Sequence, residues 1–238
     1  AADQAAVNAM RIVLQTVDMN GVIVIGEGEK DNAPMLYNGE NVGNGSGLAF
    51  DVAVDPIDGT RPLAFGRSNS LATVAIAPRG SMFNPGPFVY MNKLAVGPEA
   101  KGAINIEKSI TENLKAIAKA KHKDVADLTT IILDRERNNE MIAEIRKSGA
   151  RIRQIPDGDV AAALMTAWPD SGVDVLFGIG GTPEGVLAAC ALRAMGGEIQ
   201  GKLYARDADE SRRGHEAGYD FDKVLTMNDL VSSEDVFF

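Results

Sequence analysis

Two aspartates stand three residues apart at the end of an apolar run, in the stretch "VAVDPIDGTRPLAF" from Val52 to Phe65. Carboxylates with this spacing beside a turn can hydrogen-bond the backbone of the turn or bind a hard divalent cation. Pro56 and Gly59, which accompany Asp55 and Asp58, are ordinary turn residues. A structural turn and a metal site are therefore both open interpretations of this stretch.

Polar residues also follow three later strand-like runs. Asp134-Arg135-Glu136-Arg137 follows "TTIIL", Asp157-Gly158-Asp159 follows "RIRQI", and the glycine-rich run 178–185 follows "VDVLF". Each cluster alone has a structural explanation: a solvated face, a helix N-cap at Asp159, and a turn in which Thr182 caps a helix and Pro183 opens it. Because ligands bind at the carboxyl ends of parallel strands, we expect the three clusters to share one crevice.

The glycine-rich run raises a rival interpretation, a dinucleotide-binding loop. Gly178 and Gly180 match the start of that fingerprint, but proline occupies position 183, where the third glycine belongs. Only Glu198 is available as the acidic residue expected about 20 positions later. The run still suits a phosphate, because a helix N-terminus presents free N–H groups and the positive end of a dipole.

Composition limits the possible partners. The formal charge of −9 and the pI of about 4.8 argue against nucleic acid or an anionic membrane surface as the main partner. A single cysteine, Cys190, lies in the apolar run "VLAACALRAM", where we expect it in the core of a cytoplasmic protein. The chain starts without methionine and stops after an apolar run, so we expect residues to be missing at both ends.

The elements that must position these residues alternate between strand and helix. Val7, Met10, Leu14 and Val17 recur at helical spacing, with Asp3 at the expected N-cap. Strands are expected at "VIVI", "FDVAVD" and "SLATVAIA". The runs "TTIIL", "RIRQI" and "VDVLF" are separated by helical patterns over 139–147 and 160–168, which predicts parallel pairing. The pattern changes near residue 109, so we expect an N-terminal lobe over 1–108 and a C-terminal α/β lobe over 109–238.

Taken together, these motifs resemble a known family. "DPIDGT" is similar to the metal-binding signature of the lithium-sensitive sugar and inositol phosphatases. The runs "GVIVIGEGEKDNAPMLYNGE", "IPDGDVAAAL" and "GIGGTPEGVLAA" resemble one branch of that superfamily, the bacterial class II fructose-1,6-bisphosphatases, and the similarity extends from Asp3 to the final "EDVFF". The resemblance implies an α/β fold, the layered α/β/α/β/α sandwich of the sugar phosphatases.

The resemblance also implies roles for individual residues. It implies metal ligands for Mn²⁺ or Mg²⁺ at Asp3, Glu27, Asp55, Asp58 and Glu184. It implies that Thr60 positions the attacking water, with Glu27 as one candidate to receive its proton. It implies substrate contacts at Asp58, Gly59, Thr60, Tyr90, Arg135, Glu136, Arg137, Asp157, Gly158, Asp159 and Gly181.

Physical reasoning is consistent with a metal site. Two carboxylates about 4 Å apart repel by roughly 4 kcal/mol at an effective dielectric constant near 20, and a divalent cation removes that repulsion. An all-oxygen ligand set favours Mg²⁺ or Mn²⁺ over zinc. Both histidines, His122 and His215, stand in polar stretches, which argues against a histidine nucleophile or base.

The implied reaction is hydrolysis of the C1 phosphate of fructose 1,6-bisphosphate to fructose 6-phosphate in gluconeogenesis, by a homo-oligomer, either a dimer or a tetramer. In extended backbone Arg135 and Arg137 would point the same way and hold the distal phosphate, which argues against an inositol monophosphate. The alternatives are a dual fructose-1,6-/sedoheptulose-1,7-bisphosphatase, an inositol-phosphate or nucleotide 3′-phosphatase, and a dinucleotide-binding reductase or non-catalytic binding protein.

Two departures from the family pattern affect the predicted site. The chain reads Arg135-Glu136-Arg137-Asn138 where many relatives read R-P-R-H, and an inward-turned Glu136 would weaken phosphate binding. Asp58 stands where some relatives use the longer glutamate, which would change the spacing around a metal ion.

Overall fold

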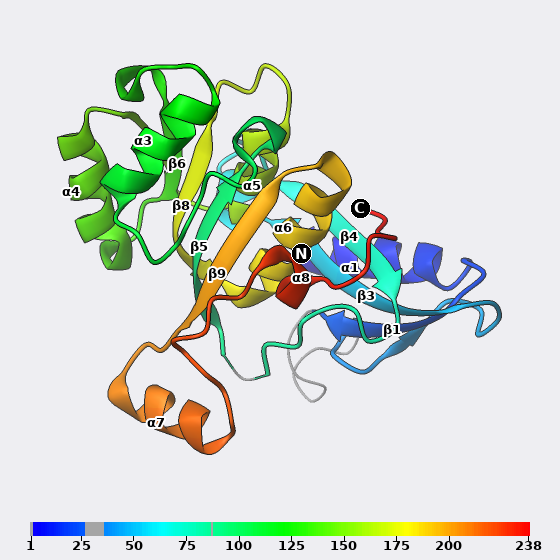
Figure 1. Ribbon diagram of the computed structural model, residues 1–238. Helices are drawn as coiled ribbons and strands as arrows, with labels where there is room; N and C mark the ends of the chain where they lie inside the picture. Colours follow the sequence, from blue (N-terminus) through cyan, green and yellow to red (C-terminus); the bar gives the residue numbers. More distant parts are fainter. Residues whose placement is uncertain (1, 27–35, 87) are drawn as a thin grey trace.

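Two mixed β-sheets with helices on their faces form the described part of the chain, residues 2–26, 36–86 and 88–238 of a computed structural model (Figure 1). The first sheet has the strand order β2-β1-β3-β4, and the second has the order β7-β6-β8-β5-β9. The strands of the first sheet are β1 (Asn20–Ile25), β2 (Asn41–Val42), β3 (Ala49–Asp58) and β4 (Leu71–Pro78). Those of the second are β5 (Tyr90–Val96), β6 (Thr129–Leu133), β7 (Arg151–Ile155), β8 (Val175–Gly181) and β9 (Glu198–Tyr204).

The α-helices are α1 (Ala2–Leu14), α2 (Thr60–Ala64), α3 (Ile110–Ala120), α4 (Asn139–Ser148), α5 (Asp159–Ala167), α6 (Thr182–Met195), α7 (Ala208–Glu216) and α8 (Met227–Leu230). Short 3₁₀ turns are η1 (Pro98–Ala100), η2 (Val125–Asp127) and η3 (Glu136–Asn138). None of the helices among the described residues is long and apolar enough to cross a membrane.

The first sheet carries the opening motif. β3 runs parallel to β1 and antiparallel to β4, and it continues through the motif to Asp58 with a register shift between Asp55 and Asp58. α1 packs on the outer face of this sheet through Val7 and Leu14, as the helical spacing predicted. The helix starts at Ala2, so Asp3 lies in its first turn, after the N-cap position where the sequence placed it.

The second sheet confirms the predicted alternation. β6 and β7 have the predicted ranges and pair in parallel, and β6 also pairs in parallel with β8. β5, which the sequence analysis did not identify as a strand, lies between β8 and β9 and pairs antiparallel with both. A strand from the first 108 residues therefore belongs to the second sheet, and the division of the chain into two lobes stays a prediction.

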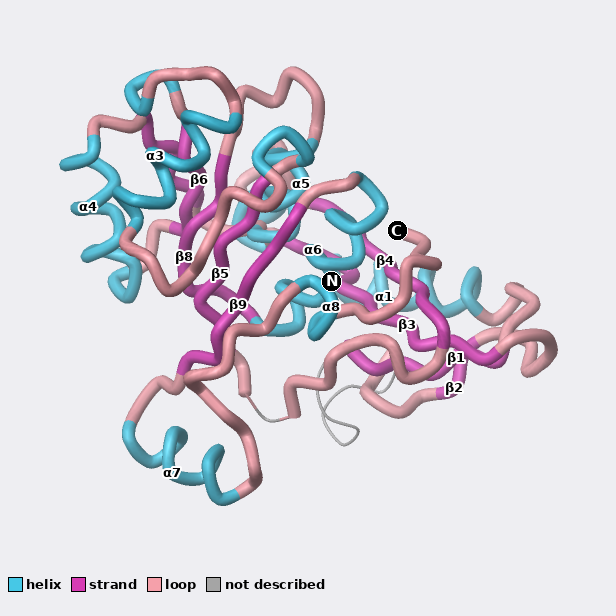
Figure 2. Tube along the Cα trace, in the orientation of Figure 1, coloured by secondary structure: helices cyan, strands magenta, loops and turns pink. Residues whose placement is uncertain are grey.

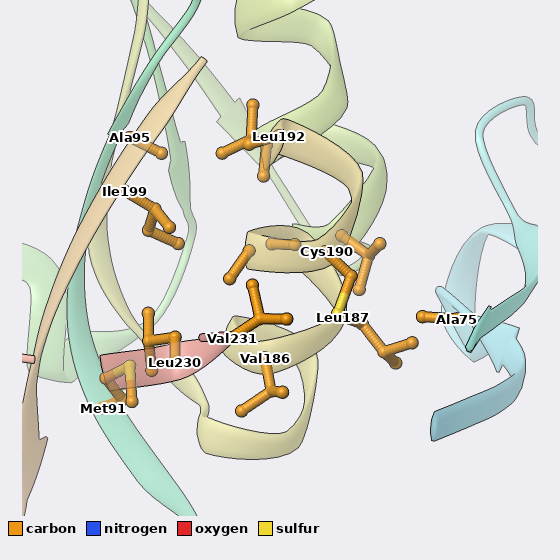
Figure 3. Close-up of a cluster of buried hydrophobic side chains, with 14 of the residues drawn as sticks. Ala75, Met91, Ala95, Val186, Leu187, Cys190, Leu192, Ile199, Leu230 and Val231 are labelled. Carbon is orange, nitrogen blue, oxygen red and sulfur yellow. The ribbon is translucent and has the colours of Figure 1, made fainter. Parts of the chain in front are cut away.

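The helices complete the layers. α3 and α4 cover one face of the second sheet, and their apolar faces form a core with that sheet alone (Figure 2). α5 and α6 lie between the two sheets, where one core cluster joins Ala75 of β4 to Met91 and Ala95 of β5 (Figure 3). The order is thus helix, sheet, helix, sheet, helix, which confirms the predicted α/β sandwich.

Cys190 occupies the centre of α6, as predicted. Its side chain is buried among the residues between the sheets (Figure 3). Burial raises the pKa of its thiol to about 12. A thiol with that pKa is protonated at neutral pH, so Cys190 acts as a small apolar core residue.

Asn138 joins two strands close to the predicted crevice. β6 and β8 pair only at Thr130↔Val175 and Ile131↔Leu176, and beyond that point the gap is bridged by the buried carboxamide of Asn138. Its Nδ2 donates to the Leu133 carbonyl at 3.0 Å, and its Oδ1 accepts from the Ile179 N–H at 2.8 Å. Asn138 thereby satisfies the buried Ile179 N–H, and it adds a second donor to the Leu133 carbonyl, which also accepts from the Arg135 N–H at 3.0 Å.

We predict that Asn138→Ala destabilises the fold by about 2–4 kcal/mol, because it leaves the buried Ile179 N–H without a partner and removes a second hydrogen bond, to the Leu133 carbonyl. Thermal unfolding followed by circular dichroism should show a melting temperature lower by about 5 °C or more. Asn139→Ala is the matched control, because Asn139 is exposed and should tolerate the change. Equal melting temperatures for the two variants would contradict this role of Asn138.

Candidate functional site

An acidic cleft lies where β1, β3 and the first turns of α2, α5 and α6 meet. Its volume is about 290 Å³. The lining residues are Ile25, Gly26, Val54, Asp55, Ile57, Asp58, Gly59, Thr60, Asp157, Asp159, Pro183, Glu184 and Leu187. The cleft therefore gathers predicted site residues from three segments that are far apart in the sequence.

Two glycines allow two of these helices to start at the cleft. Gly59 precedes α2 and Gly158 precedes α5, and both adopt a φ of +88°, a conformation that other residues rarely adopt. A Cβ added to Gly59 would lie 3.6 Å from the Cα of Gly158 and 3.4 Å from the carbonyl oxygen of Asn69. The close approach of the two glycines brings Thr60 and Asp159 to the same cleft.

The helix starts differ from the expected ones by one residue. Asp159 and Thr182 are the first helical residues of α5 and α6, while the N-cap positions are held by Gly158 and Gly181. A Cβ on Gly181 would overlap the Glu184 carboxylate, so a side chain there would displace that carboxylate. The predicted caps at Asp159 and Thr182 are therefore wrong, and the space near Glu184 explains Gly181.

The two aspartates of the opening motif have different environments. Asp55 Oδ1 accepts from the Ile57 N–H at 3.0 Å, a local turn-type hydrogen bond within the irregular end of β3, which continues to Asp58. Asp58 is only 3% exposed, and its Oδ2 accepts from the Ala161 N–H in the first turn of α5 at 2.9 Å. Both carboxylates line the acidic cleft, so these hydrogen bonds are compatible with metal binding by each of them.

Burial and like charge perturb two carboxyl groups of the cleft. Burial is the main cause that raises the pKa of Asp58 from 3.8 to about 7, with the nearby charge of Asp159 as the second cause. Burial also raises the pKa of Glu184 from 4.5 to about 7, again with Asp159 adding to the rise and Lys93 opposing it. Glu184 Oε2 is buried and has no hydrogen-bond partner among the described residues.

These observations fit a divalent cation. An ionised carboxylate can only accept hydrogen bonds. A buried carboxylate oxygen that has no donor and lies near other carboxylates therefore needs a positively charged partner. Asp55, Asp58 and Glu184 are the predicted ligands that line the cleft. Asp3 is exposed in the first turn of α1 and is not part of the lining, and Glu27 lies outside the described residues.

Among the residues that the structure describes, no three Asp, Glu, His or Cys side chains are arranged as a finished metal site. The predicted five-residue ligand set therefore stays a prediction.

Thr60 is hydrogen-bonded to a carboxylate that the sequence analysis placed in the substrate cleft. Its Oγ1 donates to Asp157 Oδ2 at 3.3 Å, and the Arg61 N–H donates to the same oxygen at 3.3 Å. A guanidinium nitrogen of Arg135 lies 3.6 Å from Asp157 Oδ1. Asp157 thus connects the end of the opening motif to the first predicted arginine.

The two predicted arginines contact different groups. Arg135 is extended, but the chain turns into η3 at the next residue, so Arg137 does not continue the strand direction. Arg137 Nε donates to the Ile179 carbonyl at 2.9 Å, and its guanidinium carbon lies 4.3 Å from the centre of the Tyr90 ring. The extended backbone from which a common direction of the two side chains was expected therefore ends at Arg135. Glu136, between them, is exposed.

Lys93 is a residue of this region that the sequence analysis missed. It is buried on β5, forms a salt bridge with Asp159 and donates to the Gly181 carbonyl at 2.9 Å. The available signal was a single lysine in the apolar run "YMNKLAV", because a charge on an interior strand needs a partner.

We predict that the cation-free protein loses stability as the pH rises from 5 to 8. The folded-state pKa values of Asp58 and Glu184 lie above their unfolded values, so the unfolded chain releases these protons first and unfolding becomes easier with rising pH. The melting temperature of chelator-treated protein should be several degrees lower at pH 8 than at pH 5, and Asp58→Asn should reduce that difference.

Mn²⁺ added at pH 8 should restore the melting temperature of the wild type. Asp229, whose pKa is lowered to about 2 by Lys223 and Thr226, changes stability only below about pH 4, outside this window. An identical pH dependence in Asp58→Asn and wild type would contradict the assignment of the effect to the cleft.

Comparisons with known proteins agree with the geometry. The family profile described as "Bacterial fructose-1,6-bisphosphatase, glpX-encoded" matches residues 1–238. Fructose-1,6-bisphosphatase 1 class 2 of Escherichia coli (strain K12) is 49% identical over 250 aligned residues, which cover 100% of this chain and 74% of the relative. The class 2 enzymes of Escherichia coli O6:H1 and Shigella flexneri give the same values. The chain belongs to the bacterial, glpX-encoded fructose-1,6-bisphosphatase family.

Proposed function

We propose that this protein hydrolyses the C1 phosphate of fructose 1,6-bisphosphate to give fructose 6-phosphate and inorganic phosphate. Its family consists of metal-dependent phosphatases. The observation that carries the proposal is the acidic cleft, in which the carboxylates of the opening motif lie beside Thr60, Asp157 and Glu184. We further propose that the enzyme acts in the cytoplasm as a homo-oligomer. We also propose that neither nucleic acid nor a membrane is its partner, and the acidic composition supports this last point.

The cation site is proposed at Asp55, Asp58 and Glu184, with Asp3 and Glu27 as the further predicted ligands. A bound divalent cation would neutralise the crowded carboxylates and polarise the reacting phosphate. Oxygen ligands alone favour Mn²⁺ or Mg²⁺. The raised pKa values of Asp58 and Glu184 support this site, because buried carboxylates beside another negative charge ionise more easily when a cation is bound between them.

Thr60 is proposed to orient the attacking water. A threonine hydroxyl is too weak a base to take a proton by itself at neutral pH, so it needs an acceptor for its own proton. Asp157 Oδ2 already accepts a hydrogen bond from that hydroxyl. We propose that the proton of the water passes to Thr60 as the Thr60 proton passes to Asp157, while the backbone of Gly59 and Thr60 holds the reacting phosphate.

The distal end of the substrate is assigned to the second sheet. Arg135 lies next to Asp157, and the stacking of Arg137 on Tyr90 holds the second guanidinium in one place. Gly158, Asp159 and Gly181 complete the proposed substrate cleft, and Glu136 is proposed at its exposed rim. Gly178 and Gly180 are part of β8 and do not form a loop, which removes the basis for a dinucleotide site.

We predict that the protein releases phosphate from fructose 1,6-bisphosphate with Mn²⁺ or Mg²⁺ and loses this activity with chelator. The measurement is phosphate release from fructose 1,6-bisphosphate, sedoheptulose 1,7-bisphosphate, an inositol monophosphate and a nucleotide 3′-phosphate. Asp55→Asn and Glu184→Gln should each raise the Mn²⁺ concentration needed for half-maximal activity. Undiminished turnover without metal, or a clear preference for the inositol or nucleotide ester, would overturn the proposed function.

We predict that Thr60→Ala lowers kcat by about two orders of magnitude or more with a smaller change in KM, because the hydroxyl acts in the chemical step. Thr60→Ser is the matched control and should retain much more activity, since it keeps the hydroxyl. Steady-state kinetics at saturating Mn²⁺ measure both variants. Equal losses in the alanine and serine variants would show that the hydroxyl has no role.

A further inference from the structure

Lys93 is a buried cation next to the acidic cleft that is not part of the mechanism given above. It lies on β5 in the interior of the second sheet, and its side chain is 3% exposed. Lysine is almost never buried this deeply unless its ammonium group is paired. The pairing of Lys93 therefore indicates what this side chain does.

Its two partners belong to the two helices that point into the cleft. The ammonium group forms a salt bridge with Asp159, the first residue of α5. It also donates to the carbonyl of Gly181, the N-cap residue of α6, at 2.9 Å. A single side chain from β5 thus ties together the first turns that carry Asp159 and Glu184.

The glycine-rich run leaves space for this lysine. A Cβ added to Gly180 would lie 2.9 Å from Lys93 Nζ and 2.1 Å from Asp159 Oδ2, so any side chain there would separate the pair. A Cβ added to Gly185 would lie 3.3 Å from Lys93 Cδ. Neither glycine has a positive φ, so space and not backbone conformation explains both of them.

We propose that Lys93 is a positioning residue of this active site. Its ammonium group fixes Asp159 and the turn from Gly181 to Glu184, so that the carboxylates of α5 and α6 converge on one divalent cation and one substrate. The identity of the substrate in this inference rests on the proposed function, while the contacts of Lys93 are those described above.

A simpler role would be charge balance alone. Of Asp58, Asp159 and Glu184, only Asp159 forms a salt bridge within the described residues. If Lys93 only cancelled that charge, its removal would add negative charge to the cleft and strengthen cation binding. If Lys93 positions the two turns, its removal weakens cation binding. The two roles therefore predict opposite results.

The experiment compares Lys93→Met and Gly180→Ala with wild type. Lys93→Met removes the ammonium group, while Gly180→Ala keeps every charge but forces Lys93 and Asp159 apart. Lys202→Met is the matched control, because Lys202 lies on the neighbouring strand β9 and forms no salt bridge among the described residues. Mn²⁺ is titrated into chelator-treated protein without substrate, and the Mn²⁺ concentration at which the melting temperature begins to rise reports the affinity.

We expect both test variants to raise this Mn²⁺ concentration about tenfold or more, the usual scale for residues that support metal ligands, and Lys202→Met to leave it unchanged. At saturating Mn²⁺ we expect kcat for fructose 1,6-bisphosphate to fall at least tenfold in both test variants, with a smaller change in KM. If Lys93→Met does not fold, Gly180→Ala alone decides the question.

A wild-type or lower Mn²⁺ requirement in a folded test variant would overturn the positioning role. Failure of the proposed function can be told apart from failure of this inference. If the wild type does not hydrolyse fructose 1,6-bisphosphate, the Mn²⁺ titration without substrate still tests the role of Lys93.

Discussion

Mutual repulsion between buried carboxylates is the constraint on which the rest of the structure depends. Burial raises the pKa values of Asp58 and Glu184, and the nearby charge of Asp159 raises both further. Flexible loops would relieve such repulsion by moving the side chains apart. In this protein the three residues are attached to β3, α5 and α6, whose packing between the sheets holds them in place.

The layered arrangement follows from this requirement. The acidic cleft takes residues from the first sheet and from helices that pack against the second, so neither sheet alone would contain it. The core between the sheets joins Ala53 and Ala75 of the first to Met91 and Ala95 of the second through α6. Apolar burial in this shared core supplies the free energy that offsets the crowding of charge, since burial is the dominant favourable term in folding.

Regular periodicity made much of this fold predictable, and irregular local structure explains the errors. The bounds of β6, β7, α4 and α5 follow from apolar spacing, within one residue for the helices. β5 was missed because it is an interior strand interrupted by Lys93, whose burial depends on partners distant in the sequence. The helix starts were shifted because glycine precedes both helices: Gly158 lies against Asn69 and Gly59 from another segment, and Gly181 lies against the Glu184 side chain of α6 itself. Local capping rules do not include such contacts.

The candidate site was predicted by residue type better than by geometry. Asp55, Asp58, Thr60, Asp157, Asp159 and Glu184 do line one cleft. The extended backbone expected from Arg135 to Arg137 was wrong, because η3 begins directly after Arg135 and turns the chain. The bond between Thr60 and Asp157 joins residues 97 positions apart, and no local pattern in the sequence indicates such a contact.

The departure from the family pattern at Glu136 and Asn138 is explained by the same turn. Glu136 opens η3 and points to solvent, so its negative charge is screened and does not face the acidic cleft. Asn138 ends η3 and fixes the backbone of Ile179, whose carbonyl in turn accepts from Arg137. Of the two residues that differ from the R-P-R-H pattern, Asn138 therefore acts on the backbone beside Arg137, while the Arg137 guanidinium group lies over Tyr90.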